Sequence, residues 1–183
     1  MPVVLPLLLS LLPVANTTLV EPLPVVHDLD IESFYGKYLE IGTYAQWWEA
    51  GCSNTAMTFA KMENSTQLRA RLTIECDRGF FHPKMRGQSM PIDDAVPARM
   101  MLTFKPPVGK TMREEFDVIM AADDYSWIVV GHPSRTLLWV LARRPEIPTY
   151  TLAGILEQLR QFYGYADVYT KFSCTKHSGA DLA

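Results

Sequence analysis

Apolar and polar residues alternate along much of this chain in short segments that are typical of β-strands. The clearest segment spans residues 67–77, where every second position is apolar. Its apolar positions are Leu68, Ala70, Leu72, Ile74 and Cys76, and its polar positions are Arg69, Arg71, Thr73 and Glu75. Since successive side chains of a strand point to opposite faces, the pattern predicts a strand with one buried and one solvated side.

Seven further segments with strand-like composition are separated from this one and from each other by short breaks. The predicted strands cover residues 34–48, 52–62, 67–77, 81–90, 99–105, 115–121, 125–131 and 135–143. The breaks hold turn-forming residues such as the Asp123-Asp124 pair. Eight antiparallel strands with short turns are too many for a small open sheet, so the pattern predicts an all-β fold, an eight-stranded antiparallel up-and-down barrel.

One helix is predicted after the last of these strands. It begins at Pro148-Thr149, ends at Gly164 and carries a single apolar stripe. The stripe consists of Leu152, Ile155, Leu156, Leu159 and Phe162. A helix with one apolar stripe packs on the outside of the barrel wall. Residues 167–174 predict a short ninth strand, and residues 175–183 a flexible tail.

The second and third strands form a predicted hairpin with a two-residue turn at Asn64-Ser65. This turn pairs Phe59 with Ala70, Met57 with Leu72, Thr55 with Ile74 and Ser53 with Cys76. The register places Met57, Phe59 and Cys76 inside the barrel and Cys52 outside it.

The N-terminal segment is apolar and uncharged over residues 1–15. It is too short to span a bilayer, and a cleaved secretory signal that ends near Ala15 is the preferred interpretation. A retained anchor is the alternative. Two glycosylation acceptor sequences, at Asn16 and Asn64, agree with secretion. Residues 16–30 are an extended lead-in, and residues 31–174 form the barrel domain.

Composition narrows the range of functions. The chain has 183 residues, 48% of them hydrophobic, which suffices for one domain with a large core. A net charge of −3 and 17 scattered Lys and Arg residues give no basic stripe for nucleic acid. The four histidines share no spacing typical of a metal site, and no cofactor is predicted, with a haem ligand among them left as an open alternative.

Three segments resemble the motifs of the lipocalin family. Residues 34–41, FYGKYLEI, resemble the first motif, with Tyr38 where the family usually has tryptophan. Residues 124–133 resemble the second motif, and residues 138–145, LWVLARRP, the third. The order and spacing are most similar to the subgroup of bacterial outer-membrane lipocalins and apolipoprotein D. The resemblance covers about residues 30–174.

The resemblance implies roles for several residues. Gly36 opens the first strand, and Tyr38 and Arg143 would close one end of the barrel, with the arginine over the aromatic ring. Trp139 matches an aromatic residue that faces the ligand cavity in the family.

Apolipoprotein D also implies a Cys52–Cys174 disulfide, with which the hairpin register agrees. The rival Cys52–Cys76 pairing would require opposite faces of the sheet to meet. Cys76 would then be an inward-facing free thiol, and the family includes an isomerase that uses such a thiol as a nucleophile.

The predicted function is the binding and transport or sequestration of a small hydrophobic ligand, with no catalytic residues. An eight-stranded barrel can hold one small ligand. The predicted lining residues are Tyr44, Thr55, Met57, Phe59, Leu72, Met100, Leu102, Phe104, Phe116, Val118, Met120, Leu137, Trp139 and Leu141. A fatty acid, lysophospholipid, sterol or carotenoid would suit them.

The alternatives are an isomerase that uses Cys76 and a ligand-free barrel that contacts partners or a membrane surface. Trp47 and Trp48 are candidates for the mouth of the barrel.

Overall fold

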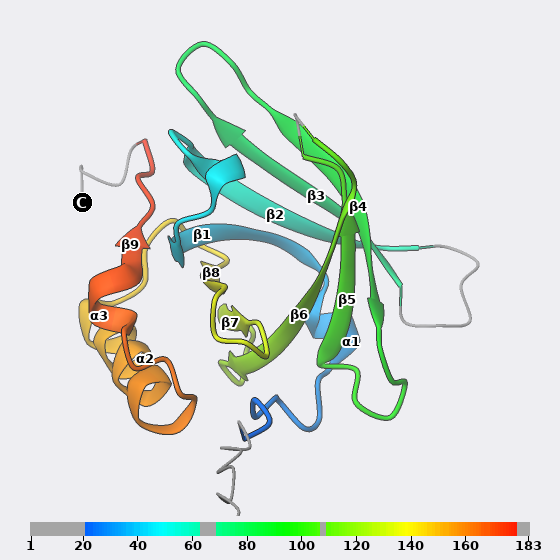
Figure 1. Ribbon diagram of the computed structural model, residues 1–183, viewed down its shortest axis with the longest axis vertical. Coiled ribbons are helices and arrows are strands. Elements are labelled where there is room, and N and C mark those ends of the chain that lie inside the picture. The colour runs from blue at the N-terminus through cyan, green and yellow to red at the C-terminus, as the bar shows by residue number, and fades with distance from the viewer. Residues whose placement is uncertain (1–20, 63–68, 107–108, 179–183) are drawn as a thin grey trace, which may run out of the picture.

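The computed structural model describes residues 21–62, 69–106 and 109–178, and its strands form one closed antiparallel barrel (Figure 1). The strands are β1 (Gly36–Tyr44), β2 (Ser53–Lys61), β3 (Ala70–Asp77), β4 (Lys84–Pro91), β5 (Arg99–Phe104), β6 (Met112–Ala121), β7 (Trp127–Gly131), β8 (Leu138–Ala142) and β9 (Phe172–Cys174). Strands β2 to β8 follow in order, and β1 closes the barrel by pairing with both β8 and β2. The predicted fold is confirmed, although several strands are shorter than expected.

Four helical segments accompany the strands. They are α1 (Ile31–Phe34), the 3-10 turn η1 (Trp47–Glu49), α2 (Thr149–Phe162) and α3 (Val168–Lys171). Figure 1 shows α2 and α3 outside the barrel, beside β9. The predicted ninth strand from residue 167 is therefore too long, because α3 occupies its first part. Over the described residues, every helix falls short of the length and apolar character that crossing a bilayer requires.

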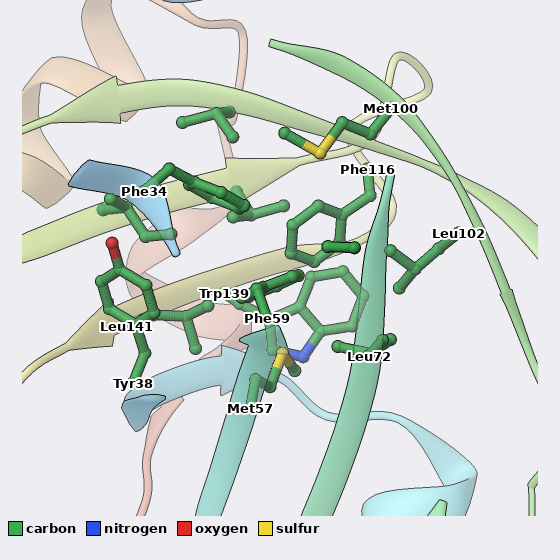
Figure 2. Close-up of a cluster of buried hydrophobic side chains, with 14 of the residues drawn as sticks. Phe34, Tyr38, Met57, Phe59, Leu72, Met100, Leu102, Phe116, Trp139 and Leu141 are labelled. Carbon is green, nitrogen blue, oxygen red and sulfur yellow. The ribbon is translucent and has the colours of Figure 1, made fainter. Parts of the chain in front are cut away.

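Two apolar layers lie on either side of the barrel wall. The inner layer fills the barrel, and Figure 2 shows ten of its side chains labelled. The outer layer lies between the wall and α2, where Ile155 and Leu159 are buried. Phe162 was expected in the same stripe but is 69% exposed. In this last turn of α2, Leu159 is buried and Tyr163 packs against the outer layer instead.

A β-bulge in β1 decides which of its side chains face inward. Glu40 pairs with Leu141 of β8, but the next pair is Gly42 with Val140, so Ile41 is an extra residue. One extra residue reverses the alternation of the strand beyond it. Tyr44 therefore lies in the outer layer, where its ring packs edge-on against Tyr165 at 5.8 Å. The prediction that Tyr44 lines the cavity is wrong for this reason.

A second bulge has the same effect in β6. Val118 pairs with Val130 of β7, and Met120 pairs with Val129, which leaves Ile119 as the extra residue. Val118 is part of the inner layer, whereas Ile119 and Met120 both belong to the outer layer. Met120 is thus the second predicted lining residue that lies outside the cavity.

The hairpin of β2 and β3 has a register two residues away from the predicted one. Met57 pairs with Ile74 and Phe59 with Leu72. A shift of two residues keeps every side chain on its predicted face, so Met57 and Phe59 point inward as expected. The predicted turn at Asn64-Ser65 lies outside the described residues.

The disulfide joins Cys52 to Cys76, not to Cys174. A bulge between Ser53 and Ala56 pairs Ser53 with Asp77 and so reverses the alternation at the start of β2. Cys52 then comes to the side of Cys76, with 5.6 Å between their Cα atoms, a usual separation for a disulfide. Asn54, inside the bulge, has a left-handed φ of 52°. Cys174 is a free, exposed cysteine.

The C-terminal segment fills the gap where β1 and β2 diverge. β9 pairs with β1 from Gly42 to Tyr44, beyond the point where β1 leaves β2. The main chain continues to Lys176, whose carbonyl accepts a hydrogen bond of 2.8 Å from the Asn54 amide of β2. Residues 175–178, which were expected in a flexible tail, therefore form part of the barrel wall.

The end of the barrel opposite η1 is closed by α1 and Arg143. The guanidinium of Arg143 lies over the Tyr38 ring, with its Cζ atom 3.6 Å from the ring centre. It also donates hydrogen bonds to the carbonyls of Ser33 (2.8 Å), Tyr35 (2.9 Å) and Lys37 (3.1 Å). These carbonyls lie at the end of α1 and the start of β1, so one side chain joins both elements to β8. Burial raises the pKa of Tyr38 to about 12.

We expect the Cys52–Cys76 disulfide to stabilise the fold by closing the β2–β3 hairpin. Its cysteines are 24 residues apart, for which the chain-entropy model gives about 3 to 4 kcal/mol. The double variant Cys52→Ser/Cys76→Ser should lose that much unfolding free energy in urea. Cys174→Ser is the control and should unfold like the wild type. A loss for Cys174→Ser that equals the loss for the double variant would contradict this pairing.

Candidate ligand-binding site

The barrel interior collects most of the predicted lining residues. Eleven of the residues named from the sequence contribute to the inner layer, Leu137 at its margin: Met57, Phe59, Leu72, Met100, Leu102, Phe104, Phe116, Val118, Leu137, Trp139 and Leu141. They come from β2, β3, β5, β6, β8 and the residue just before β8. The structure thus brings them together, while their role as ligand contacts stays a prediction.

Aromatic rings form a continuous column through this interior (Figure 2). Phe34 of α1 contacts Phe59 at 4.7 Å between ring centres, Phe59 contacts Phe116 at 5.7 Å, and Phe116 contacts Trp139 at 5.9 Å. Such offset and tilted ring pairs are favourable packing arrangements. The column runs from the closed end of the barrel toward η1, so most of the interior is already filled.

At the η1 end, Trp48 completes the filling. Its ring packs against Phe104 at 5.7 Å, and its side chain is buried. Between Trp48, Met57, Phe104, Phe116 and Trp139 remains a cavity of about 10 Å³. That volume is about the minimum for one water molecule. In this conformation the barrel has no room for a hydrophobic ligand.

The η1 turn forms a lid over the open end, which we call the mouth lid (Trp47–Glu49). The mouth lid has only three residues and joins β1 to β2. Arg78 of the β3–β4 connection donates a 2.7 Å hydrogen bond to the Trp48 carbonyl. Trp47 is 61% exposed, so the two neighbouring tryptophans have opposite environments.

A buried carboxylate, which the sequence analysis did not identify, belongs to this lid. The Trp139 indole nitrogen donates a hydrogen bond of 3.2 Å to Glu49 Oε1. Glu49 is only 8% exposed, and burial together with the charge of Glu40 raises its pKa to about 8. No local pattern marks Glu49, because its burial depends on how the turn folds over the barrel.

Glu40 is a second buried carboxylate at the same end of the barrel. Its side chain is 2% exposed, and Thr175 Oγ1 donates a hydrogen bond to its Oε1 atom. Burial raises the pKa of Glu40 to about 7. The His177 ring contacts the Glu40 carbonyl at 2.7 Å. Both contacts come from the C-terminal segment, so they could not be read from the sequence near Glu40.

Metal ligation finds no support in the part of the chain that the structure describes. That part contains no group of three or more His, Cys, Asp or Glu side chains arranged to hold a metal ion. The thiol proposed for an isomerase is also not free, because Cys76 forms the disulfide.

A closed eight-stranded barrel with an external helix and a ninth strand defines a lipocalin-type binding fold. The chain matches a model of the lipocalin-like domain over residues 29–173 and belongs to this family. No curated protein sequence matches it significantly.

Solved structures share the fold at low sequence identity. Insecticyanin from the tobacco hornworm Manduca sexta superposes with a TM-score of 0.67 at 19% identity, over 87% of this chain and 86% of insecticyanin. Lobster apocrustacyanin A1 gives a TM-score of 0.61 at 7% identity, over 85% of this chain and 91% of its own. Apocrustacyanin C2 gives the same TM-score and identity, over 86% and 91%.

The raised pKa values of Glu40 and Glu49 predict that the protein loses stability as the pH rises. Below about pH 4.5 they are protonated in both states, whereas between pH 4.5 and 8 the unfolded chain releases protons that the folded protein keeps. The unfolding free energy should therefore fall over this window, by on the order of 3 kcal/mol for Glu49. Glu49→Gln should reduce the fall, as measured by urea unfolding at several pH values.

Glu75→Gln is the matched control for this measurement. The ammonium groups of Lys84 and Lys37 lower the pKa of Glu75, so its titration lies below the window. The slope between pH 5 and 8 should stay as in the wild type. An unchanged slope in Glu49→Gln would mean that Glu49 is ionised in the folded protein.

Proposed function

We propose that this protein binds a small hydrophobic molecule in the barrel interior by exchanging it for the Trp48 side chain. The observation that carries the proposal is the position of Trp48. It is an apolar group at the mouth of an otherwise apolar barrel, and it is held by a three-residue turn rather than by a strand. A fatty acid, lysophospholipid, sterol or carotenoid has the apolar surface that would replace it.

The two ends of the barrel differ in a way that supports this exchange. At the closed end, Arg143 joins three carbonyls and an aromatic ring, and Phe34 fills the space beneath α1. At the mouth, the lid is held by the Arg78 bond to its backbone, the Trp139 bond to Glu49, and the ring contacts of Trp48 with Trp47 and Phe104. The lid is a three-residue turn rather than a strand, so a ligand would enter there.

The energies favour moderate affinity. Burying about ten methylene groups releases roughly 8 kcal/mol before association costs. Exposing Trp48 takes back about 1.5 to 3 kcal/mol, the value for one large apolar side chain. The remainder is about 5 to 6.5 kcal/mol, which corresponds to a dissociation constant of roughly 20 to 200 μM before association costs. Met57 and Met100 in the inner layer adapt to different shapes, which favours broad selectivity.

We further propose secretion and a relation to the bacterial outer-membrane lipocalin and apolipoprotein D subgroup. The apolar N-terminal segment supports secretion, and so does the Cys52–Cys76 disulfide, since disulfides persist in oxidising compartments. The subgroup rests on the order of the three sequence motifs.

A second candidate function is supported by the filled interior itself. A barrel that holds no ligand would act through its surface, as an interaction protein or at a membrane. Phe80 is 100% exposed and Phe81 is also exposed, both in the turn between β3 and β4 that Figure 1 shows at the top. Aromatic side chains at such a tip are suited to a membrane surface or an apolar partner.

Titration with a fluorescent fatty acid, read by energy transfer from tryptophan, tests the exchange. The wild type should bind saturably but weakly, with a dissociation constant on the order of 100 μM. Trp48→Ala should bind roughly ten times more tightly or better, because the ligand no longer has to displace an indole ring.

Phe162→Ala is the control for Trp48→Ala. It removes a large apolar side chain that is 69% exposed on α2, outside the barrel, and should leave the affinity unchanged. If neither the wild type nor Trp48→Ala binds the probe saturably, interior binding is refuted and the ligand-free barrel is favoured.

A further inference from the structure

A second hollow lies in the barrel wall, outside the filled interior. It is a solvent-open pocket of about 490 Å³ between the end of β1, the mouth lid, the start of β2 and the C-terminal segment. We call it the seam pocket, because it lies where the C-terminal segment fills the gap between β1 and β2. Its lining includes Glu40, Glu49, Thr55, Ser173 and Thr175.

Three buried oxygens of this lining have no hydrogen-bond partner within the described residues. They are Glu40 Oε2, Glu49 Oε2 and Thr55 Oγ1. The three side chains are 2%, 8% and 1% exposed. A buried polar atom without a partner destabilises the fold, so three such atoms on residues that line one pocket need a reason.

The chemistry of the three oxygens indicates which kind of group could donate hydrogen bonds to them. When ionised, the Glu40 and Glu49 carboxyl groups offer only acceptor oxygens, and the threonine hydroxyl can also accept a hydrogen bond. A primary ammonium group offers three N–H donors and no acceptor, together with a positive charge. Hydrogen bonds between charged groups are shorter and stronger than neutral ones.

The protein's own Lys176 does not supply this group. Lys176 also lines the seam pocket, but in the described part of the chain no hydrogen bond or ion pair joins its ammonium to either carboxylate. We therefore propose that the seam pocket binds a small primary amine, whose ammonium group lies between Glu40, Glu49 and Thr55. Burial raises the pKa of both carboxyl groups, and a bound cation would lower it again.

The site is distinct from the barrel interior, although Glu49 lines both. Glu40 and Thr55 line only the seam pocket, but the charge of Glu40 also acts on Glu49, so Thr55 is the residue whose variant tests the amine site without touching the proposed interior site.

An NMR titration with n-butylammonium chloride tests the proposal at neutral pH. Backbone amide signals of Ser53, Ser173 and Thr175 should shift saturably, and neither n-butanol nor butyrate should reproduce the shifts. Glu40→Gln keeps an oxygen for the Thr175 hydrogen bond but loses the charge. It should bind the amine at least about tenfold more weakly.

Thr55→Val separates a binding role from a structural one. The substitution replaces a buried hydroxyl that has no partner with a methyl group of the same shape, so the melting temperature should stay the same or rise. Affinity for butylammonium should nevertheless fall severalfold. Thr55→Val should bind the fluorescent fatty acid as the wild type does.

Asp117→Asn is the matched control. Asp117 is likewise a buried carboxylate with an unpartnered oxygen in the described structure, but it does not line the seam pocket. Its variant should bind the amine as the wild type does. The proposal is overturned if the wild type shows no saturable shift, if butanol binds equally well, or if Asp117→Asn loses as much affinity as Glu40→Gln.

Discussion

One extra residue in β1 determines how the rest of the molecule is arranged. The bulge at Ile41 leaves Glu40 and Thr43 paired with the inward residues Leu141 and Trp139 of β8, and it turns Tyr44 outward toward α2. Ile41 and Gly42 therefore both face outward. A Cβ atom on Gly42 would lie 2.4 Å from the Phe172 ring, so only glycine lets β9 pair there. The outward position of Tyr44 and the pairing of β9 with β1 both depend on this position.

The fold and its inner layer could be predicted because alternation extends over whole strands. Leu72 and Ile74, or Leu102 and Phe104, are separated from their neighbours by one polar position, and no bulge intervenes. The same reasoning failed for Tyr44 and Met120, because each follows a bulge. A bulge changes the face of every later residue without a clear sign in the amino-acid sequence.

The site at the mouth could not be predicted for a related reason. Cys52 meets Cys76 only because of a third bulge, and Glu49 is buried only because η1 folds inward. Glu40 is covered by Thr175, which is far away in sequence. The resemblance to apolipoprotein D supplied a disulfide partner, Cys174, that this chain does not use. Family motifs thus identified the barrel and its closed end, where Arg143 lies on Tyr38, but not the mouth.

Near the mouth, the apolar side chains are closely packed, whereas several polar oxygens lack hydrogen-bond partners among the described residues. The apolar interior is complete without a ligand, because the aromatic column and Trp48 leave only about 10 Å³. The polar groups of the seam pocket are not fully hydrogen-bonded, since oxygens of Glu40, Glu49 and Thr55 lack partners among the described residues. A hydrophobic ligand must therefore compete with the protein's own side chain, whereas a hydrogen-bond donor would meet no such competitor. The proposed amine would give the buried Thr55 hydroxyl the partner that it lacks in the described structure.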